Sequence, residues 1–190
     1  MKPLRFLLVF LCALLAFAVQ AQALLITPSS SADFFGNETS QAQISTIIGP
    51  IISPAVELYK QDFDLPEANL PLQNSYQTTF SNSDTAPSNA LIKYTGGNIV
   101  GPIAWLLVKD GNQTPAWYLF NLTAAPDPQN WNGTDDLVLE DFWPEQGSIS
   151  HVALYGTPVE GQPIPEPVSM LLFGTGLVGI GGYIRRRFKK

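Results

Sequence analysis

Two apolar segments bracket the chain and confine any globular fold to the residues between them. The first runs from Phe6 to Val19 and the second from Val168 to Ile184. Residues 24–164 hold 15 of the 16 acidic residues but only three of the ten basic ones, Lys60, Lys93 and Lys109. The resulting net charge of about −12 repels phosphate backbones. We therefore expect an acidic globular unit between two segments that interact with membranes, and no binding of nucleic acid.

The N-terminal segment has the three parts of a secretory signal peptide. Lys2 and Arg5 precede the apolar run, and small residues alternate in Ala21-Gln22-Ala23. We expect residues 1–23 to be removed after Ala23, with Ala21 and Ala23 as the cleavage signal. A retained membrane anchor is the alternative. The run contains the chain's single cysteine, Cys12, so the mature protein is expected to form no disulfide and to use no thiolate.

The second apolar segment is predicted to cross a membrane as a helix. Its 17 residues span about 25 Å, which suffices for a hydrocarbon core of about 30 Å when flanking side chains snorkel. A stop-transfer cluster of basic residues follows, consisting of Arg185, Arg186, Arg187, Lys189 and Lys190. Because basic flanks stay in the cytoplasm, we expect the acidic unit outside. The GxGxxG pattern at residues 174–179 lacks the preceding strand of a dinucleotide site, so it favours close helix contacts instead.

Directly before this segment stands the triplet Pro165-Glu166-Pro167. The order of triplet, apolar helix and basic cluster resembles the C-terminal sorting signal of PEP-CTERM proteins. The resemblance implies export in a Gram-negative bacterium and processing at this triplet by exosortase, a membrane-embedded cysteine transpeptidase. The prolines keep the triplet extended and accessible to such an enzyme. A permanent single-span anchor with a Pro-rich stalk is the alternative.

The acidic unit is predicted to be an all-β domain, an antiparallel β-sandwich of jelly-roll-like type, over residues 24–157. Short runs rich in aromatic and branched residues alternate with Gly, Pro and Asn clusters. The clearest runs are residues 103–109, 116–122, 137–143 and 149–155, and weaker ones are 55–63, 75–80 and 90–94. Residues 41–52 fit a short helix or a strand. Residues 158–167 form a Pro-rich linker, followed by the membrane segment (168–184) and the basic tail (185–190).

The connection Asp110-Gly111-Asn112-Gln113-Thr114-Pro115 is predicted to close a hairpin, because Asp-Gly favours positive backbone angles and Pro115 ends the ladder. The stretches LLVKDGNQTPAWYLFNL, WNGTDDLVLEDFWPEQG and ISHVALYG are also similar to a block found in exported domains that carry this sorting signal. That looser resemblance implies no catalytic residues.

Catalytic chemistry has few candidates in the acidic unit. His151 is the only histidine, and alternation places it on one strand face with Ile149, Ala153 and Tyr155. A structural role for His151 is favoured over a catalytic one. One histidine and no mature cysteine exclude a standard zinc site. We therefore expect no catalytic residues, no metal and no cofactor, and interpret the protein as not an enzyme.

Two binding hypotheses stay open. Calcium could use a cluster of acidic residues in loop and strand, namely Asp127, Asp135, Asp136, Glu140 and Asp141, although solvated loop acids explain the cluster equally well. A glycan could stack on an exposed tryptophan. Trp131, which lies between Asn130 and Asn132, is the best candidate, whereas Trp105, Trp117 and Trp143 are expected in the core.

The sequence thus predicts a protein exported by the Sec machinery across the inner membrane, anchored with its domain outside, and processed by exosortase. Its expected destination is the cell surface or the extracellular matrix, as a structural or adhesive component that contacts exopolysaccharide in a biofilm. A lectin-like module is the first alternative and a secreted hydrolase the weaker one.

Overall fold

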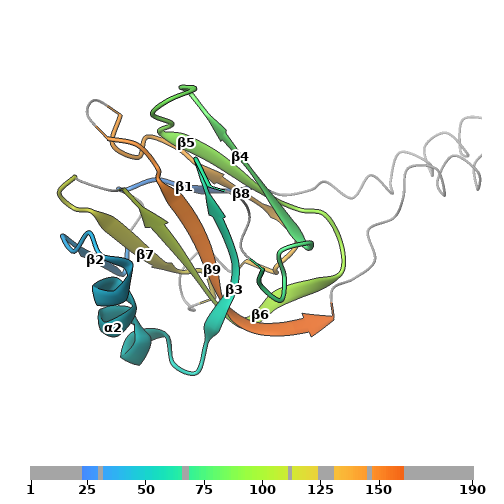
Figure 1. Ribbon diagram of the computed structural model, residues 1–190. Coiled ribbons are helices and arrows are strands. Elements are labelled where there is room, and N and C mark those ends of the chain that lie inside the picture. Colours follow the sequence, from blue (N-terminus) through green and yellow to red (C-terminus); the bar gives the residue numbers. More distant parts are fainter. Residues whose placement is uncertain are drawn as a thin grey trace, which may run out of the picture.

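The computed structural model describes residues 23–29, 32–65, 69–110, 113–123, 131–144 and 147–160. Within these ranges the chain forms nine strands and one helix. The strands make two sheets that pack face to face (Figure 1). The predicted signal peptide lies outside them except for Ala23, as do the sorting triplet, the apolar segment and the basic tail. Those assignments stay predictions. Among the helices in the described ranges, none has the length and apolarity needed to cross a bilayer.

One sheet has four strands in the order β1-β8-β5-β4, and the other has five in the order β2-β7-β6-β9-β3. The strands span Ala23–Ile26 (β1), Phe34–Gly36 (β2), Val56–Asp62 (β3), Tyr76–Ser81 (β4), Asn89–Tyr94 (β5), Asn98–Lys109 (β6), Trp117–Asn121 (β7), Asp136–Leu139 (β8) and His151–Glu160 (β9). The coarse prediction of an all-β, two-sheet sandwich is therefore confirmed.

The pairing of β1 with β8 departs from the predicted antiparallel, jelly-roll-like arrangement. Leu24 lies opposite Leu137 in a parallel register, whereas the other strand pairs are antiparallel. A parallel pair needs a long connection, and here most of the domain separates the two strands in sequence. The β6–β7 hairpin across the Asp110–Pro115 loop is confirmed.

Local backbone geometry explains where the predicted strand ends were wrong. The strand expected to run to Trp143 ends at Leu139, because Asp141 (φ 59°) and Trp143 (φ 49°) adopt left-handed conformations that break a ladder. Strand β6 begins at Asn98, well before Ile103, since Pro102 falls in a bulge between Gly101 and Ala104 where the ladder needs no amide donor. Strand β9 continues to Glu160, past residue 157 where we placed the end of the domain.

Residues 41–52, which fitted either a helix or a strand, form the helix α2 (Gln41–Ile52). Its buried residues are Ile44, Ile48 and Ile52, whose spacing of four places them on one helical face. Ser40 stands at the N-cap without a side-chain hydrogen bond, and Pro50 lies inside the last turn. The helix covers the outer face of the five-stranded sheet (Figure 1).

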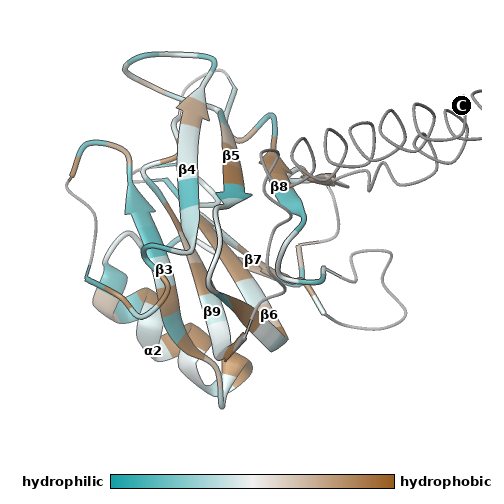
Figure 2. Ribbon diagram, turned by 90° about the vertical axis from the view of Figure 1, so that its right-hand side faces the viewer, coloured by the Kyte–Doolittle hydropathy of each residue, from teal (hydrophilic) through white to brown (hydrophobic). Residues whose placement is uncertain are grey.

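The main core, which we call the inner core, lies between the two sheets. It includes Ile92 from β5, Leu137 from β8 and Leu106 from β6. Figure 2 shows the central strands β9 and β6 as largely hydrophobic, while the edge strands β3 and β4 carry hydrophilic segments. A second cluster, the outer core, lies between α2 and the far face of the five-stranded sheet.

Candidate functional site

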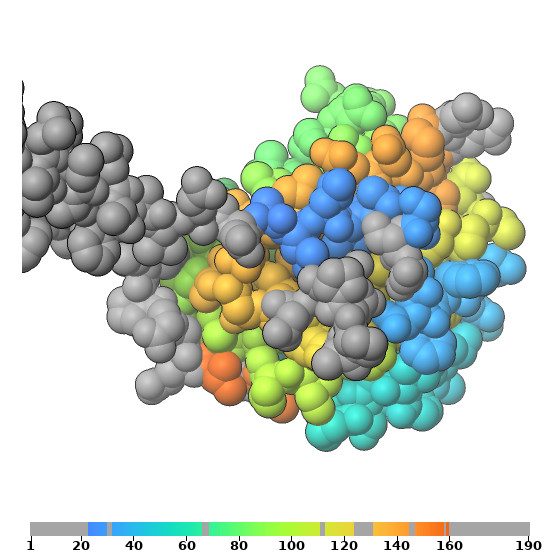
Figure 3. Space-filling model, turned by 180° about the vertical axis from the view of Figure 1, so that it is seen from behind, coloured from blue at the N-terminus to red at the C-terminus, as the bar shows by residue number. Residues whose placement is uncertain are grey.

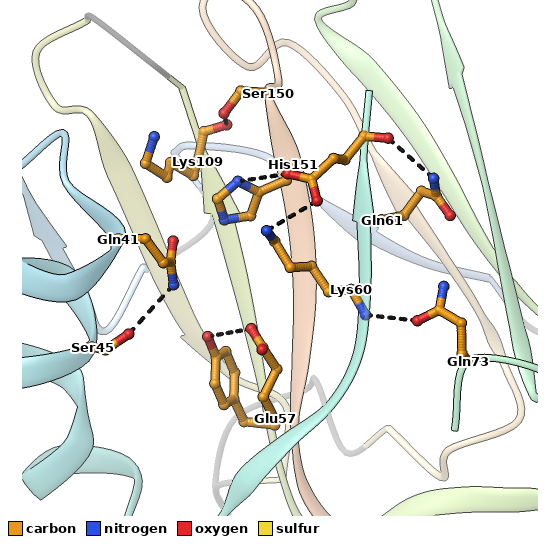
Figure 4. Close-up of polar contacts among 11 residues, drawn as sticks. Gln41, Ser45, Glu57, Lys60, Gln61, Gln73, Lys109, Ser150 and His151 are labelled. Atoms are coloured by element: carbon orange, nitrogen blue, oxygen red, sulfur yellow. Dashed lines mark hydrogen bonds and ion pairs between the residues drawn. The ribbon is translucent and has the colours of Figure 1, made fainter. Parts of the chain in front are cut away.

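A row of charged and polar side chains crosses three strands of the five-stranded sheet. Asp62 on β3 lies opposite His151 on β9, and His151 lies opposite Lys109 on β6. Lys60 precedes Asp62 by two residues and shares its strand face. We call Lys60, Asp62, Lys109 and His151 the polar row (Figure 4). It contains two of the domain's three lysines and its only histidine.

The row lies on the face of the sheet that α2 partly covers. Ala153 and Tyr155, which alternate with His151 along β9, belong to the outer core. The predicted shared face of His151, Ala153 and Tyr155 is therefore confirmed. Ile149 is different: it precedes the strand and packs into the inner core, because the alternation begins only where the ladder begins.

Asp62 is the centre of the electrostatic contacts in the row. One carboxylate oxygen lies 2.9 Å from Lys60 Nζ, and the other lies 3.6 Å from His151 Nδ1. Lys109 Nζ donates a hydrogen bond to the Asp110 carbonyl at 3.0 Å, and the Asp110 carboxylate accepts one from the Ser148 amide at 2.6 Å. Both lysines of the row therefore have oxygen partners inside the domain.

Burial shifts the pKa values of two groups in the row, His151 and Lys109. Burial, aided by the positive charge of Lys60, lowers the pKa of His151 to about 3, although the carboxylate of Asp62 opposes the shift. Burial also lowers the pKa of Lys109, against the opposing effect of Asp110. Since an effective general base has a pKa near the operating pH, a histidine with this pKa is a weak proton acceptor. The imidazole is therefore neutral at ordinary pH.

Three buried polar atoms on the same face of the sheet have no hydrogen-bond partner among the described residues. They are His151 Nε2, Gln41 Oε1 from the first turn of α2, and Trp105 Nε1 from β6. Nearby, the hydroxyl of Tyr155 donates to Glu57 at 3.0 Å. A buried polar group without a hydrogen bond destabilises the folded state. The contact between α2 and the sheet therefore leaves more hydrogen-bonding groups of the described residues unpaired than the inner core does.

The acidic residues considered for calcium are not brought together. Asp135 and Asp136 lie at the start of β8, and Glu140 and Asp141 follow its end. The described part of the chain contains no group of three or more His, Cys, Asp or Glu side chains that could hold a metal ion. Asp127 lies outside the described residues.

Trp131 is not exposed, and the prediction that it offers a stacking surface is wrong. Only 5% of it is accessible. Its ring lies 6.0 Å from that of Tyr76, and its Nε1 donates to the Asp135 carbonyl at 2.8 Å. The loop folds this ring inward because burying its large apolar surface lowers the free energy of the folded domain. Trp105 and Trp117 are buried as expected, and Trp143 is half-buried.

Sequence reasoning singled out His151 but missed its neighbours. The alternation of Lys60 and Asp62 on a strand was visible in the sequence. Their meeting with His151 and Lys109 depends on the register of β3, β9 and β6, which no local pattern of residues predicts.

The comparisons with known proteins concern the other candidate site, the sorting triplet. The family model described as the PEP-CTERM protein-sorting motif matches residues 163–187, a range that includes Pro165, Glu166 and Pro167. No curated protein and no solved structure matches the chain. The match confirms the resemblance at the C-terminal end, and an all-β domain precedes it. This chain is therefore a protein that carries a PEP-CTERM sorting motif.

Proposed function

We propose that this protein is a non-enzymatic, exported β-sandwich that serves as a structural or adhesive component of the cell envelope or exopolysaccharide matrix. The observation that carries the proposal is the sorting motif at residues 163–187. That motif implies exosortase-dependent sorting of an exported protein that is first anchored in the membrane and then processed. Export by the Sec machinery in a Gram-negative cell, and arrival in a biofilm matrix, belong to the proposal.

The polar row supports a non-enzymatic role. Lys60 and Asp62 are already paired, and the low pKa of His151 keeps the imidazole neutral at ordinary pH. A hydrolase would need an acid–base pair whose pKa values lie near the operating pH. His151, whose pKa is lowered by burial, does not supply such a group.

The lectin-like alternative loses the residue on which it depended. Trp131 packs in the inner core, and Trp105 and Trp117 are also buried. A passive structural component needs no exposed aromatic platform, so the burial of these rings favours it over a lectin. Saturable binding of the purified protein to one defined glycan would reverse that preference.

The proposal is tested by intact-mass measurement of protein recovered from cells and from the extracellular matrix. We expect the wild-type chain to begin at Leu24 and to end near Pro165–Pro167, with or without an added group. Glu166→Ala is expected to keep the chain intact to Lys190 and in the membrane fraction. Gln162→Ala, which lies outside the triplet, is the matched control and should be processed like wild type. Processing of Glu166→Ala at the wild-type position would contradict sorting through this triplet.

A further inference from the structure

The strand β1 begins at the bond where we expect the signal peptide to be removed. Cleavage after Ala23 would separate Ala23 from Leu24, and both residues belong to β1. Ala23 lies opposite Asp136 of β8, and Leu24 lies opposite Leu137. Figure 3 shows the blue segment that contains β1 on the surface of the domain, next to the amber atoms of the segment that contains β8. The expected cleavage bond is therefore part of the folded sheet.

The contacts of β1 hold it at the edge of the four-stranded sheet. Ile26 is fully buried in the inner core, and Leu24 packs against that core. The amide of Glu140, which follows β8, donates a hydrogen bond to the Ile26 carbonyl at 3.0 Å. Leu25, which alternates with them along the strand, is 52% exposed. The strand is therefore attached to the domain by one face and by its backbone, and it can leave the sheet only by breaking both kinds of contact.

A signal peptidase needs a different arrangement of the same residues. A protease that reads an extended peptide pairs with its backbone on both sides of the bond that is cut. In the folded domain the backbone of Ala23 and Leu24 is already paired with β8. Cleavage of a structured segment then depends on the fraction of molecules in which that segment is open. Docking of β1 on β8 and cleavage after Ala23 therefore exclude each other.

The partner of β1 is exported late. Export starts from the N-terminal end, and β1 ends at Ile26 whereas β8 begins only at Asp136. Most of the domain must therefore cross the membrane before the two strands can meet. An antiparallel hairpin partner would follow β1 directly, but a parallel pair needs a long connection, and pairings between distant segments form slowly. The parallel register of β1 and β8 thus leaves the cleavage bond unpaired during export.

We infer that the pairing of β1 with β8 sets the period in which the signal peptide can be removed. The Ala23–Leu24 bond is accessible from the moment of its export until β8 has followed and β1 has docked, and it is protected afterwards. A precursor that folds before cleavage keeps its signal peptide. After timely cleavage the chain begins at Leu24 inside the sheet, without an unpaired overhang that a protease could enter. The inference rests on the export in the proposed function.

The experiment compares two samples of the complete precursor, residues 1–190, in the same mild detergent. One sample is refolded before purified signal peptidase is added, and the other is diluted from urea directly into the enzyme. Fluorescence of the buried Trp117 and Trp131 reports refolding, and intact mass gives the initial rate at which residues 1–23 are released. We expect the refolded precursor to be cleaved about ten-fold or more slowly, because its cleavage follows the small fraction of molecules in which β1 is undocked.

Two substitutions in β1 separate docking from recognition by the enzyme. Ile26→Asp places a charge at a fully buried position and should undock β1, so that the refolded variant is cleaved several-fold faster than refolded wild type. Leu25→Asp adds the same charge at the exposed neighbouring position and is the matched control, which should be cleaved as slowly as wild type. All three chains should be cleaved at the same rate when unfolded, which shows that neither substitution alters recognition.

Equal initial rates for the refolded and the unfolded wild-type precursor overturn the inference, whether or not Ile26→Asp folds. Equal protection of Ile26→Asp and Leu25→Asp also overturns it, because the protection would then not depend on the docking of β1. An unfolded precursor that is not cleaved after Ala23 contradicts the signal peptide itself, and with it the export in the proposed function. The two failures are therefore distinguishable.

Discussion

The inner core and the outer core share one sheet but differ in how completely they are packed and hydrogen-bonded. In the inner core, Tyr76 contacts the rings of Tyr59, Tyr94 and Trp131, and its buried hydroxyl makes two hydrogen bonds. In the outer core, three isoleucines of α2 cover a face that also holds the polar row and three polar atoms with no hydrogen-bond partner in the described part of the chain. We therefore expect the sheet-on-sheet contact to carry most of the stability and α2 to be the element that opens most easily.

The largest expected effect comes from truncating the inner core at Trp131. Trp131→Ala removes a ring that packs on Tyr76, and loss of a buried aromatic ring destabilises by about 3–5 kcal/mol. Urea unfolding measures the change. Phe35→Ala, at a ring that is largely exposed, is the control and should stay within about 0.5 kcal/mol of wild type. A small effect of Trp131→Ala would mean that the ring is exposed in solution.

A smaller effect is expected in the outer core. Ile48→Ala removes the central contact of α2, and because the helix can settle toward the sheet we expect a loss of about 2–3 kcal/mol, at the lower end for such substitutions. Amide hydrogen exchange should accelerate in α2 and stay unchanged in β5 and β6. Faster exchange in all three elements would show that the two cores open as one unit.

The protonation of His151 should make stability depend on pH. Its pKa of about 3 in the folded protein lies below the ordinary value of about 6.5, so the unfolded chain binds more protons in this window and stability falls as the pH falls. Between pH 7 and pH 5 the expected loss is about 2 kcal/mol. Besides burial, the charges of Lys60, Asp62 and Lys109 shift the pKa of this histidine.

His151→Gln removes the titrating group and should flatten the pH dependence over this range, as measured by urea unfolding at each pH. The difference between wild type and variant at each pH isolates the part of the pH dependence that requires His151. If wild type and variant lost the same stability between pH 7 and pH 5, His151 would have to be accessible to protons in the folded domain.

The smallest expected effect comes from a substitution that stabilises α2 and so reduces the difference between the outer and the inner core. Its first turn contains no acidic residue, so Gln43→Glu places a negative charge near the positive end of the helix dipole and should add about 0.3–1 kcal/mol. Slower amide exchange in α2 would register the gain. Gln43→Lys, with the opposite charge at the same exposed position, should speed exchange, and an equal response to both variants would exclude the dipole as the cause.

Particular elements show how far sequence patterns reach. Alternation located β3, β4, β5 and β7 closely, because each strand presents one face to a core. It missed β1 and β2, which are short edge strands defined mainly by their partners. At the candidate site, it placed His151 on the correct face but could not find Asp62 and Lys109 beside it, since cross-strand neighbours depend on register.

The sequence by itself determined the sorting motif, the acidity of the domain and its mostly β architecture. These features follow from the composition and from the order of neighbouring residues, so they can be recognised without knowing how the chain packs. Only the tertiary structure decided the parallel pairing of β1 with β8, the inward position of Trp131 and the meeting of Asp62, His151 and Lys109 across three strands. Each of these depends on which distant segments meet, and that choice is made by burying apolar surface across the whole domain.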